Sequence, residues 1–543
     1  MPSSHAAGGD APSVESIVHY ARLLGVPLTR PDARKLRPSL ASFLQGGRHL
    51  VPRAESRTLF VPEGPSRVPD SPLPAPSLAT EQVNGIRHLR GSAAIAPSHA
   101  GSLSIAEVAS YYRAQHLSPV TVTKSLLEAI HQHESALNAW ITILDGKAIA
   151  EAKESETRLL QGRPRSLIDG VPIVLKDNID LAGFTTTCGS IIMPKRKARG
   201  DALVASALRQ AGAIILGKAN LLEFAYGAVH PKFGQTNNPW NVTRTAGGSS
   251  GGCAAAVAAG DAFGAIGTDT GGSVRIPAAY CGLVGLKPTY NLLDTAGVFP
   301  LSQTSDHLGL MGRSSEDVGI LLASILHRED TVPHAPCDLK GLRIGILGTG
   351  AYAGITPGVE RVWQTALSAL HSAGVLLDYV DLPGLDAAPT VLQHIVVPEA
   401  TRVHFQWLRT RAPDYAEGTR IQLFLGLFGP GVFYLSAHAA RQRIKDAWHQ
   451  LLGRFDVIVS LTVPWVAPRR EPAFGSLEAA IEPINTAPHN LTGLPAVTLP
   501  CGTAEEGMPV GLQITAGWYQ EVQLLGIAQA AEEILNFRRP PAL

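Results

Sequence analysis

The feature that most constrains the fold is the rhythm of the sequence after residue 104, where short apolar runs alternate with helical patterns. Such runs occur at residues 171–175, 213–216, 342–347 and 456–460, and residues 202–211 between them show helical periodicity. Runs of this kind are typical of strands that are buried on both faces because helices cover the sheet. We therefore predict an α/β fold with a largely buried sheet.

The organisation of the chain changes before this region. A chain of 543 residues exceeds the size at which a single hydrophobic core stops growing, about 250–300 residues. Apolar residues recur at helical spacing over residues 14–24 and again over about 31–44, whereas prolines are frequent after residue 62. Ser104 and Glu107 then form the pattern of a capping box. We predict a small N-terminal helical extension (1–60) that acts as a docking or dimerisation arm, a proline-rich linker (61–103) and a main domain (104–543).

Composition excludes several classes of protein. The formal net charge is +1, and no block of like charges suggests a nucleic-acid partner. No run approaches the ~20 apolar residues that span a membrane, and the start of the sequence lacks the pattern of a secretory signal. The five cysteines are scattered, which argues against a disulfide framework and a structural zinc site. We therefore expect a soluble cytoplasmic protein without a cofactor or metal.

A lysine stands at the end of one predicted strand. The apolar run at residues 171–175 leads directly into Lys176. Taken alone, such a lysine usually extends to solvent along its aliphatic stem. If it stays inside, burial disfavours the ammonium form and lowers the pKa, so that a neutral amine becomes available as a base.

Two glycine-rich segments place serines where a nucleophile is needed. Ser249 and Ser250 lie between pairs of glycines, directly before an alanine-rich helical pattern. Ser273 follows two glycines, and glycines leave backbone amides uncovered, as an oxyanion hole requires. Asp269 and Arg275 flank Ser273, and we expect them to brace its loop through hydrogen bonds or a salt bridge.

Three other interpretations explain less of the sequence. Residues 248–252 match the nucleophile elbow of α/β-hydrolases centred on Ser250, but this leaves Lys176 and Ser273 without a role. Residues 345–350 resemble a dinucleotide-binding loop whose third glycine is misplaced. The histidines at 131 and 133 are two residues apart, so that on a helix they do not share a face that binds a metal.

The lysine and the two serine segments, in this order and at these separations, closely resemble the amidase signature family. The resemblance extends from about residue 104 to 533 and includes the segments at 238–240, 282–289 and 490–496. It implies an α/β/α sandwich with a large mixed sheet. It also implies a Ser–cis-Ser–Lys triad, in which Ser273 is the nucleophile and Ser249 relays its proton to neutral Lys176. The remaining roles that it implies are an oxyanion hole from the amides of Thr270, Gly271, Gly272 and Ser273, with support from Ser250, Asp269 and Arg275.

The resemblance implies an amidohydrolase that acts on linear amides of small molecules, with esters and carbamates as further substrates. The alternative is the glutaminase (A-type) subunit of a tRNA-dependent amidotransferase, because Arg420 lies near the position where those subunits place a carboxylate-binding arginine. A third hypothesis is an inactive binding protein, which the intact triad disfavours.

Substrate preference is expected to depend on residues 185–195, 226–235, 300–310 and 395–435. The last range is rich in aromatic residues, which indicates a bulky apolar substrate unless these side chains serve helix packing. The aromatic residues are Phe405, Trp407, Phe424, Phe428, Phe433 and Tyr434.

Overall fold

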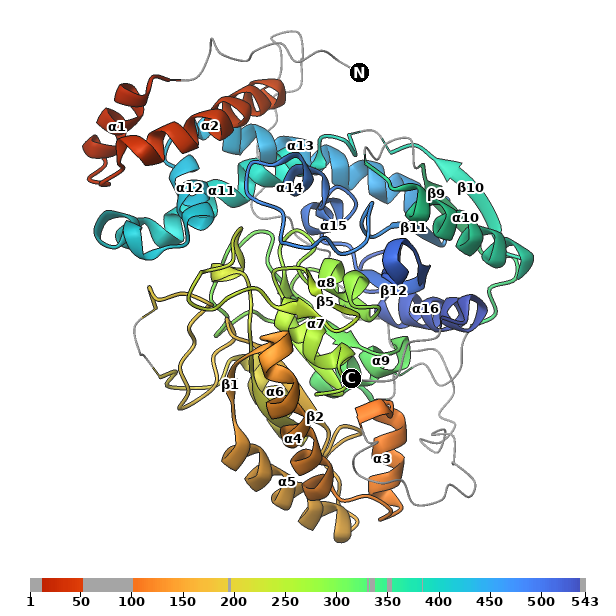
Figure 1. Cartoon of the computed structure of the whole chain (residues 1–543). Coiled ribbons are helices and arrows are strands. Elements are labelled where there is room, and N and C mark those ends of the chain that lie inside the picture. Colours follow the sequence, from red (N-terminus) through yellow and green to blue (C-terminus); the bar gives the residue numbers. More distant parts are fainter. Residues whose placement is uncertain are drawn as a thin grey trace.

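The structure, a computed structural model, describes residues 12–51, 101–193, 197–329, 332, 337–348, 354–382 and 384–537. The predicted linker at 61–103 lies almost entirely outside these residues. The described part is built around one sheet of 11 strands with helices on both faces (Figure 1). This is the α/β fold that the sequence predicts.

The sheet is mixed. Its parallel pairs are β2–β3, β2–β6, β9–β10 and β9–β11, and the other neighbours are antiparallel. In spatial order the strands are β1 (Trp140–Ile143), β3 (Ile214–Ala219), β2 (Pro172–Lys176), β6 (Gly264–Asp269), β8 (His307–Gly312), β7 (Val284–Lys287), β12 (Ala496–Thr503), β13 (Pro509–Thr515), β11 (Val457–Leu461), β9 (Arg343–Leu347) and β10 (Leu376–Val380).

The helices surround this sheet. They are α1 (Val14–Leu23), α2 (Arg30–Leu50), α3 (Ile105–Arg113), α4 (Pro119–Leu137), α5 (Asp145–Leu160), α6 (Leu203–Gln210), α7 (Gly251–Ala258), α8 (Arg275–Tyr280), α9 (Ser315–Ile325), α10 (Pro357–Ser372), α11 (Ala388–Thr410), α12 (Glu417–Leu425), α13 (Gly431–Leu452), α14 (Leu477–Ile481), α15 (Ala487–Thr492) and α16 (Glu521–Leu535). α3 begins with the predicted capping box of Ser104 and Glu107. None of the helices in the described ranges is long and apolar enough to cross a membrane.

The glycines of β6 show how the central strand separates two helical layers. Side chains three residues apart in a strand point to opposite faces of the sheet. A Cβ on Gly264 would contact Leu321 of α9, whereas a Cβ on Gly267 would contact Ser250 and Val274. α9 therefore covers one face of β6, and the start of α7 approaches the other face closely because Gly267 carries no side chain.

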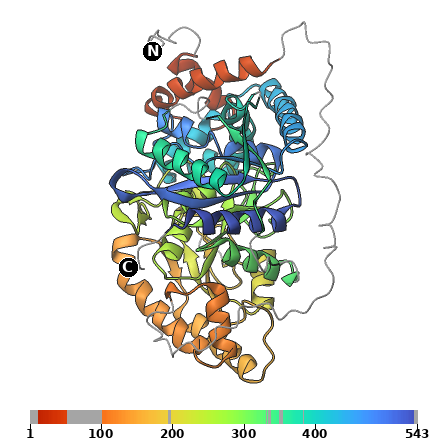
Figure 2. The ribbon, with the colours of Figure 1, turned by 90° about the vertical axis from the view of Figure 1, so that its right-hand side faces the viewer.

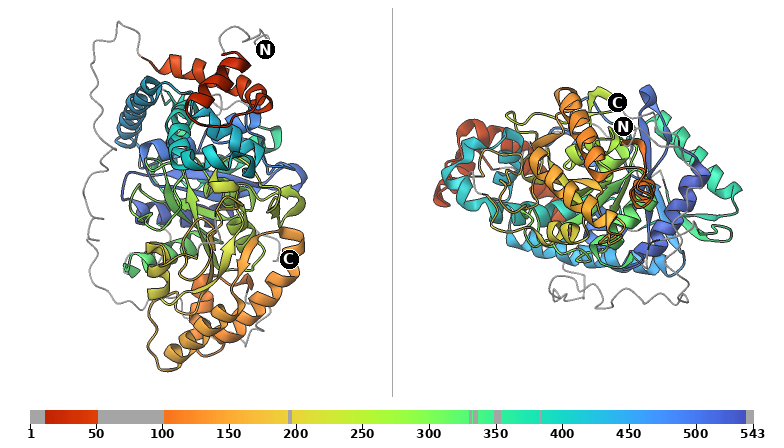
Figure 3. Two further views of the ribbon diagram at one scale, coloured as in Figure 1. Left: turned by 90° about the vertical axis from the view of Figure 1, so that its left-hand side faces the viewer. Right: turned by 90° about the horizontal axis from the view of Figure 1, so that it is seen from below.

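The two N-terminal helices lie at one end of the molecule, whereas α3, α4 and α5 lie at the other (Figures 2 and 3). The apolar face of α2, with Leu36, Leu40 and Phe43, is buried in a hydrophobic cluster with side chains of α11, α12 and α13. The arm thus packs against its own chain. Whether it also joins two chains stays a prediction.

Candidate active site

The site lies at the edge of the sheet where β2 and β6 end. These neighbouring strands are parallel, so that their carboxyl ends meet at the same edge. Lys176 is the last residue of β2, and Asp269 is the last residue of β6. The chain beyond β6 then forms the short loop that carries Ser273 before α8 begins. Sheet order therefore brings two segments together that are far apart in the sequence.

Lys176 is completely buried and has three oxygen neighbours. Its Nζ lies 2.7 Å from Oγ of Ser249 and donates to Oγ1 of Thr268 at 2.8 Å and to the carbonyl of Thr268 at 3.4 Å. A neutral amine has two N–H groups and one lone pair, so that two bonds to Thr268 leave the lone pair for the Ser249 hydroxyl. Burial lowers the pKa of Lys176 to about 7, despite the acidic groups nearby.

The double serine forms the turn before α7. The peptide bond between Gly248 and Ser249 is cis, as the resemblance implies. Ser250 donates its hydroxyl to the carbonyl of Thr268 at 3.2 Å and its backbone amide to the carbonyl of Ser273 at 3.1 Å. The turn is thus fixed to the end of β6 on one side and to the Ser273 loop on the other. Its local geometry gives Ser250 a structural role beside Ser249.

Ser273 is half-buried and lines a cavity of about 570 Å³ together with Thr270 and Gly271. Within the described residues, no hydrogen bond joins the hydroxyls of Ser249 and Ser273. Hydrogen bonds between catalytic groups are often long in an enzyme without substrate and shorten when substrate binds. Ser273 thus lies at the cavity surface, whereas Ser249 and Lys176 are buried.

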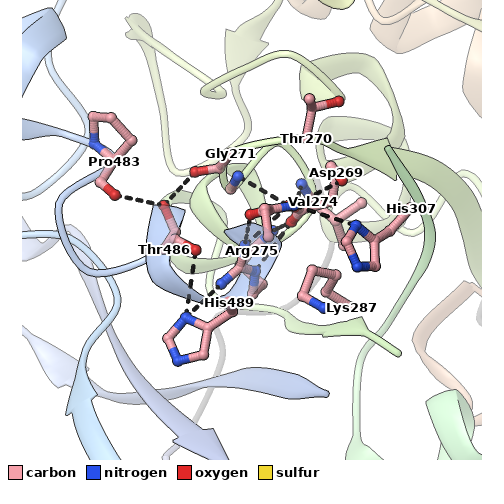
Figure 4. Close-up of polar contacts among 12 residues, drawn as sticks. Asp269, Thr270, Gly271, Val274, Arg275, Lys287, His307, Pro483, Thr486 and His489 are labelled. Carbon is pink, nitrogen blue, oxygen red and sulfur yellow. Dashed lines mark hydrogen bonds and ion pairs between the residues drawn. The ribbon is translucent and has the colours of Figure 1, made fainter. Parts of the chain in front are cut away.

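The predicted oxyanion hole needs one correction. The amide of Gly272 donates to Oδ1 of Asp269 at 2.9 Å, so that it is already engaged. The hydroxyl of Thr486 donates to the carbonyl of Gly271 at 2.6 Å and fixes that peptide group (Figure 4). In the described part of the chain, the amides of Thr270, Gly271 and Ser273 have no hydrogen-bond acceptor. These three amides are the ones left to bind an incoming carbonyl oxygen.

A buried ion pair braces the loop, as the sequence predicts. Arg275 donates to Asp269 from Nε at 3.0 Å and from Nη2 at 2.9 Å, and both side chains are inaccessible to water. Arg275 also donates to Gln513 and Asn490, both at 2.8 Å. Burial alone would raise the pKa of Asp269, but Arg275 and Asn490 hold it well below its usual range. Figure 4 shows Arg275 between Asp269 and His489, and it contacts both.

Sequence reasoning missed the residues that position the predicted ones. Thr268 orients Lys176 and also accepts from Nδ2 of Asn178 at 3.0 Å. Asp306 accepts the hydroxyl of Thr270 at 2.6 Å, together with two backbone amides. Burial raises the pKa of Asp306 to about 6, although these hydrogen bonds act to lower it. A signal for Asp306 existed, since it directly precedes β8, which runs antiparallel to β6 and starts where β6 ends.

Arg420 is not at the cavity, contrary to the expectation from the amidotransferase resemblance. It lies on α12, and its Nη2 donates to Oδ1 of Asp32 of α2 at 2.9 Å. Both side chains are mostly buried. The N-terminal extension therefore provides the carboxylate that this arginine binds.

The walls of the cavity agree only in part with the predicted ranges. Tyr226, Leu301, Val396 and Gln422 fall within three of them, whereas no described residue of 185–195 lines the cavity. The six aromatic residues singled out in 395–435 do not line it either. Trp407, for example, stacks on Phe224. Of the two interpretations of these aromatics, packing is therefore the one that the structure supports, and they give no evidence for a bulky apolar substrate.

Three segments outside the predicted ranges complete the cavity. One is the face of α2 that carries Ser39, and another is the segment from Phe474 to Ile484, which includes α14. The third is the start of α11 together with Asp386 before it. None of the three has a motif, so that only the packing of the chain reveals its position.

Comparison with known proteins identifies the family of the chain. The family model described as Amidase matches residues 121–525. Among curated proteins, the chain is 35% identical over 482 residues to the A-type subunit of glutamyl-tRNA(Gln) amidotransferase from Symbiobacterium thermophilum, an alignment that covers 81% of this chain and 99% of the relative.

Solved structures of similar fold include enzymes that act on different amides. Peptide amidase from Stenotrophomonas maltophilia is 29% identical with a TM-score of 0.68, and the match covers 81% of this chain and 98% of that one. A 6-aminohexanoate cyclic dimer hydrolase is 26% identical with a TM-score of 0.73, over 82% of this chain and 99% of that one. The segments around Lys176, Ser249 and Ser273, the fold and these matches together show that the chain belongs to the amidase signature family, whose members act on carbon–nitrogen bonds.

Proposed function

We propose that the chain is an amidohydrolase that cleaves linear amides through an acyl-enzyme on Ser273. The observation that carries the proposal is the completely buried Lys176, whose Nζ lies 2.7 Å from Oγ of Ser249, in a chain whose Ser273 lines a cavity. A serine hydroxyl is a weak nucleophile until a neighbouring base removes its proton. A lysine serves as this base only when it is neutral, which burial favours here.

The proposed first half-reaction forms the acyl-enzyme. Oγ of Ser273 attacks the carbonyl carbon of the amide, its proton passes to Oγ of Ser249, and the proton of Ser249 passes to Nζ of Lys176. The carbonyl oxygen becomes an oxyanion, which the amides of Thr270, Gly271 and Ser273 stabilise. Lys176 then returns a proton through Ser249 to the nitrogen of the leaving group, because an amine leaves only after protonation.

The second half-reaction uses the same groups in the same order. Water takes the place of the released amine, gives up its proton through Ser249 to Lys176, and attacks the acyl carbon. Collapse of the second tetrahedral intermediate returns the proton to Ser273 and releases the carboxylic acid. Esters and carbamates fit the same scheme because they also present an acyl carbon with a leaving group.

The electrostatics of the cavity favour a substrate whose acyl group is not anionic. Among the described residues that line the cavity there is no lysine, arginine or histidine, and Asp386 contributes negative charge. A carboxylate placed there would lose its hydration without gaining a cation. The arginine expected to bind such a carboxylate, Arg420, is held by Asp32 instead.

The second candidate is the glutaminase subunit of a tRNA-dependent amidotransferase, which the names of the curated relatives favour. Such a subunit binds the α-carboxylate of glutamine and works within a complex. The two candidates differ in a single assay, the release of ammonia by the purified chain from glutamine and from a panel of uncharged carboxamides and aryl amides.

Hydrolysis of uncharged amides by the isolated chain, with glutamine inert, supports the amidohydrolase. Preferential release of ammonia from glutamine overturns it and supports the amidotransferase component. Ser273→Ala is the control for both outcomes, since any ammonia that this variant releases comes from another source. Light scattering of the same sample also tests the predicted homodimer, and fractionation of cells tests the predicted cytoplasmic location.

A further inference from the structure

The second N-terminal helix is docked on the main domain through contacts that fix its position. The ring of Phe43 stacks on His394 of α11 with centroids 4.1 Å apart, and Nε2 of His394 lies 2.9 Å from the carbonyl of Phe43. Gly47 lies directly against the ring of Phe433 of α13, so that any side chain there would overlap it. The ion pair between Asp32 and Arg420 holds the first turn of the same helix. α2 is therefore held along its length and not by its ends alone.

An adjoining face of the same helix borders the cavity that contains Ser273. Pro38, Ser39 and Ser42 line it, and Ser39 and Ser42 are three residues apart, which places them on one face of a helix. Ser39 also lies close to Gly475, since a Cβ on Gly475 would be 3.0 Å from Oγ of Ser39. α2 thus bridges the space between α11 and that segment (Figures 1 and 3).

This helix lies outside the part of the chain that the family shares. The family match begins at residue 121, and about four fifths of the chain covers nearly the whole length of the relatives. One wall of the cavity is therefore formed by α2, which lies outside the segment that matches the family, whereas Ser273 lies within that segment. The wall contributes two hydroxyl groups and no charge to the cavity.

We infer that α2 is a specificity element of the active site, which limits the length of the acyl group that Ser273 accepts. The inference rests on the proposed function for the identity of the substrate as an amide. A cavity of about 570 Å³ is in the range of small-ligand sites and holds a compact acyl group. Ser39 and Ser42 line the same cavity as Ser273, so that they accept or donate a hydrogen bond to a polar end of the acyl group and exclude a longer chain.

The test replaces Ser39 by a large side chain and measures access to Ser273. In Ser39→Trp the indole fills the far end of the cavity, and Gln45→Trp is the matched control because Gln45 is exposed on α2 and does not line the cavity. The probes are two fluorophosphonates, one with a methyl and one with an octyl chain, whose rates of serine phosphonylation are followed by mass spectrometry. Hydrolysis of acetamide and hexanamide is measured in parallel.

We expect Ser39→Trp to slow the octyl probe at least about tenfold relative to the methyl probe, while Gln45→Trp leaves the ratio of the two rates unchanged. Equal slowing of both probes overturns the inference, because α2 then acts only on the stability of the site. An unchanged ratio in a folded Ser39→Trp protein also overturns it. If thermal unfolding shows that this variant is not folded, Ser42→Trp provides the same comparison.

The two proposals fail separately in this design. Phosphonylation needs only an activated serine, so that a change in the probe ratio supports the role of α2 even if neither amide is hydrolysed. Absence of amide hydrolysis by the wild-type chain, with normal phosphonylation, counts against the proposed substrate and not against the wall.

Discussion

The substitution Thr268→Val tests how Lys176 is tuned, because valine keeps the shape of threonine and removes its hydroxyl. Nζ of Lys176 donates to that hydroxyl at 2.8 Å in a fully buried site. A hydrogen bond from an ammonium is worth about 1 kcal/mol more than one from a neutral amine. Loss of the acceptor therefore destabilises the charged form, and the pKa falls by roughly 0.7 at about 1.36 kcal/mol for each pKa unit.

The assay is the dependence of kcat/KM on pH, from roughly 5.5 to about 9, for an uncharged amide. The neutral lysine is the active form, so that kcat/KM rises with pH and levels off above the pKa of about 7. In Thr268→Val the rise of kcat/KM moves to lower pH. At a pH of about 5.5, kcat/KM expressed as a fraction of the plateau value of the same enzyme is roughly fivefold larger for the variant than for the wild type. The plateau itself is lower, because Asn178 loses the same acceptor.

Thr268→Ser is the control, since it retains the hydroxyl and leaves the position of the rise unchanged. A rise that stays in place in Thr268→Val, or that moves to higher pH, refutes the assignment of Lys176 as the neutral base. Equal movement in both variants refutes it too, because the hydroxyl is then not the cause.

Three further substitutions follow from the geometry. Lys176→Ala lowers kcat by roughly 10³–10⁴-fold at every pH, because the proton acceptor for Ser249 is lost; recovery at high pH contradicts the role of base. Asp269→Asn leaves the buried Arg275 without its counter-charge and lowers the free energy of unfolding by about 3–5 kcal/mol in a urea titration, and a loss below about 1 kcal/mol contradicts this. Gly272→Ala forces a side chain onto Thr486 at a φ of +136°, which lowers both stability in the same titration and the rate of serine labelling; wild-type values for both count against a tightly fitted loop.

Local patterns were enough to predict several elements and contacts that the structure contains. The capping box of Ser104 and Glu107 depends on residues three apart, and the lysine at the end of an apolar strand is visible in a single run. The ion pair of Asp269 and Arg275 spans one loop and was equally accessible. Each of these features depends only on residues that are close together in the sequence.

Contacts between distant segments were not predictable in the same way. The pairing of Arg420 with Asp32 joins residues 388 positions apart, and no local pattern marks either partner. The engagement of the Gly272 amide depends on the side-chain rotamer of Asp269. The role of α2 as a wall follows from how α11, α12 and α13 pack, which the periodicity of α2 alone does not specify.

Covalent labelling of Ser273 tests the central claim most directly. The purified chain is treated with a methyl fluorophosphonate, digested and analysed by mass spectrometry, with Ser273→Ala and Lys176→Ala treated in parallel. We expect one adduct per chain on Ser273, none in Ser273→Ala, and labelling at least about a hundredfold slower in a folded Lys176→Ala protein. An adduct on Ser249 or Ser250, or amide hydrolysis that persists in Ser273→Ala, would contradict the claim.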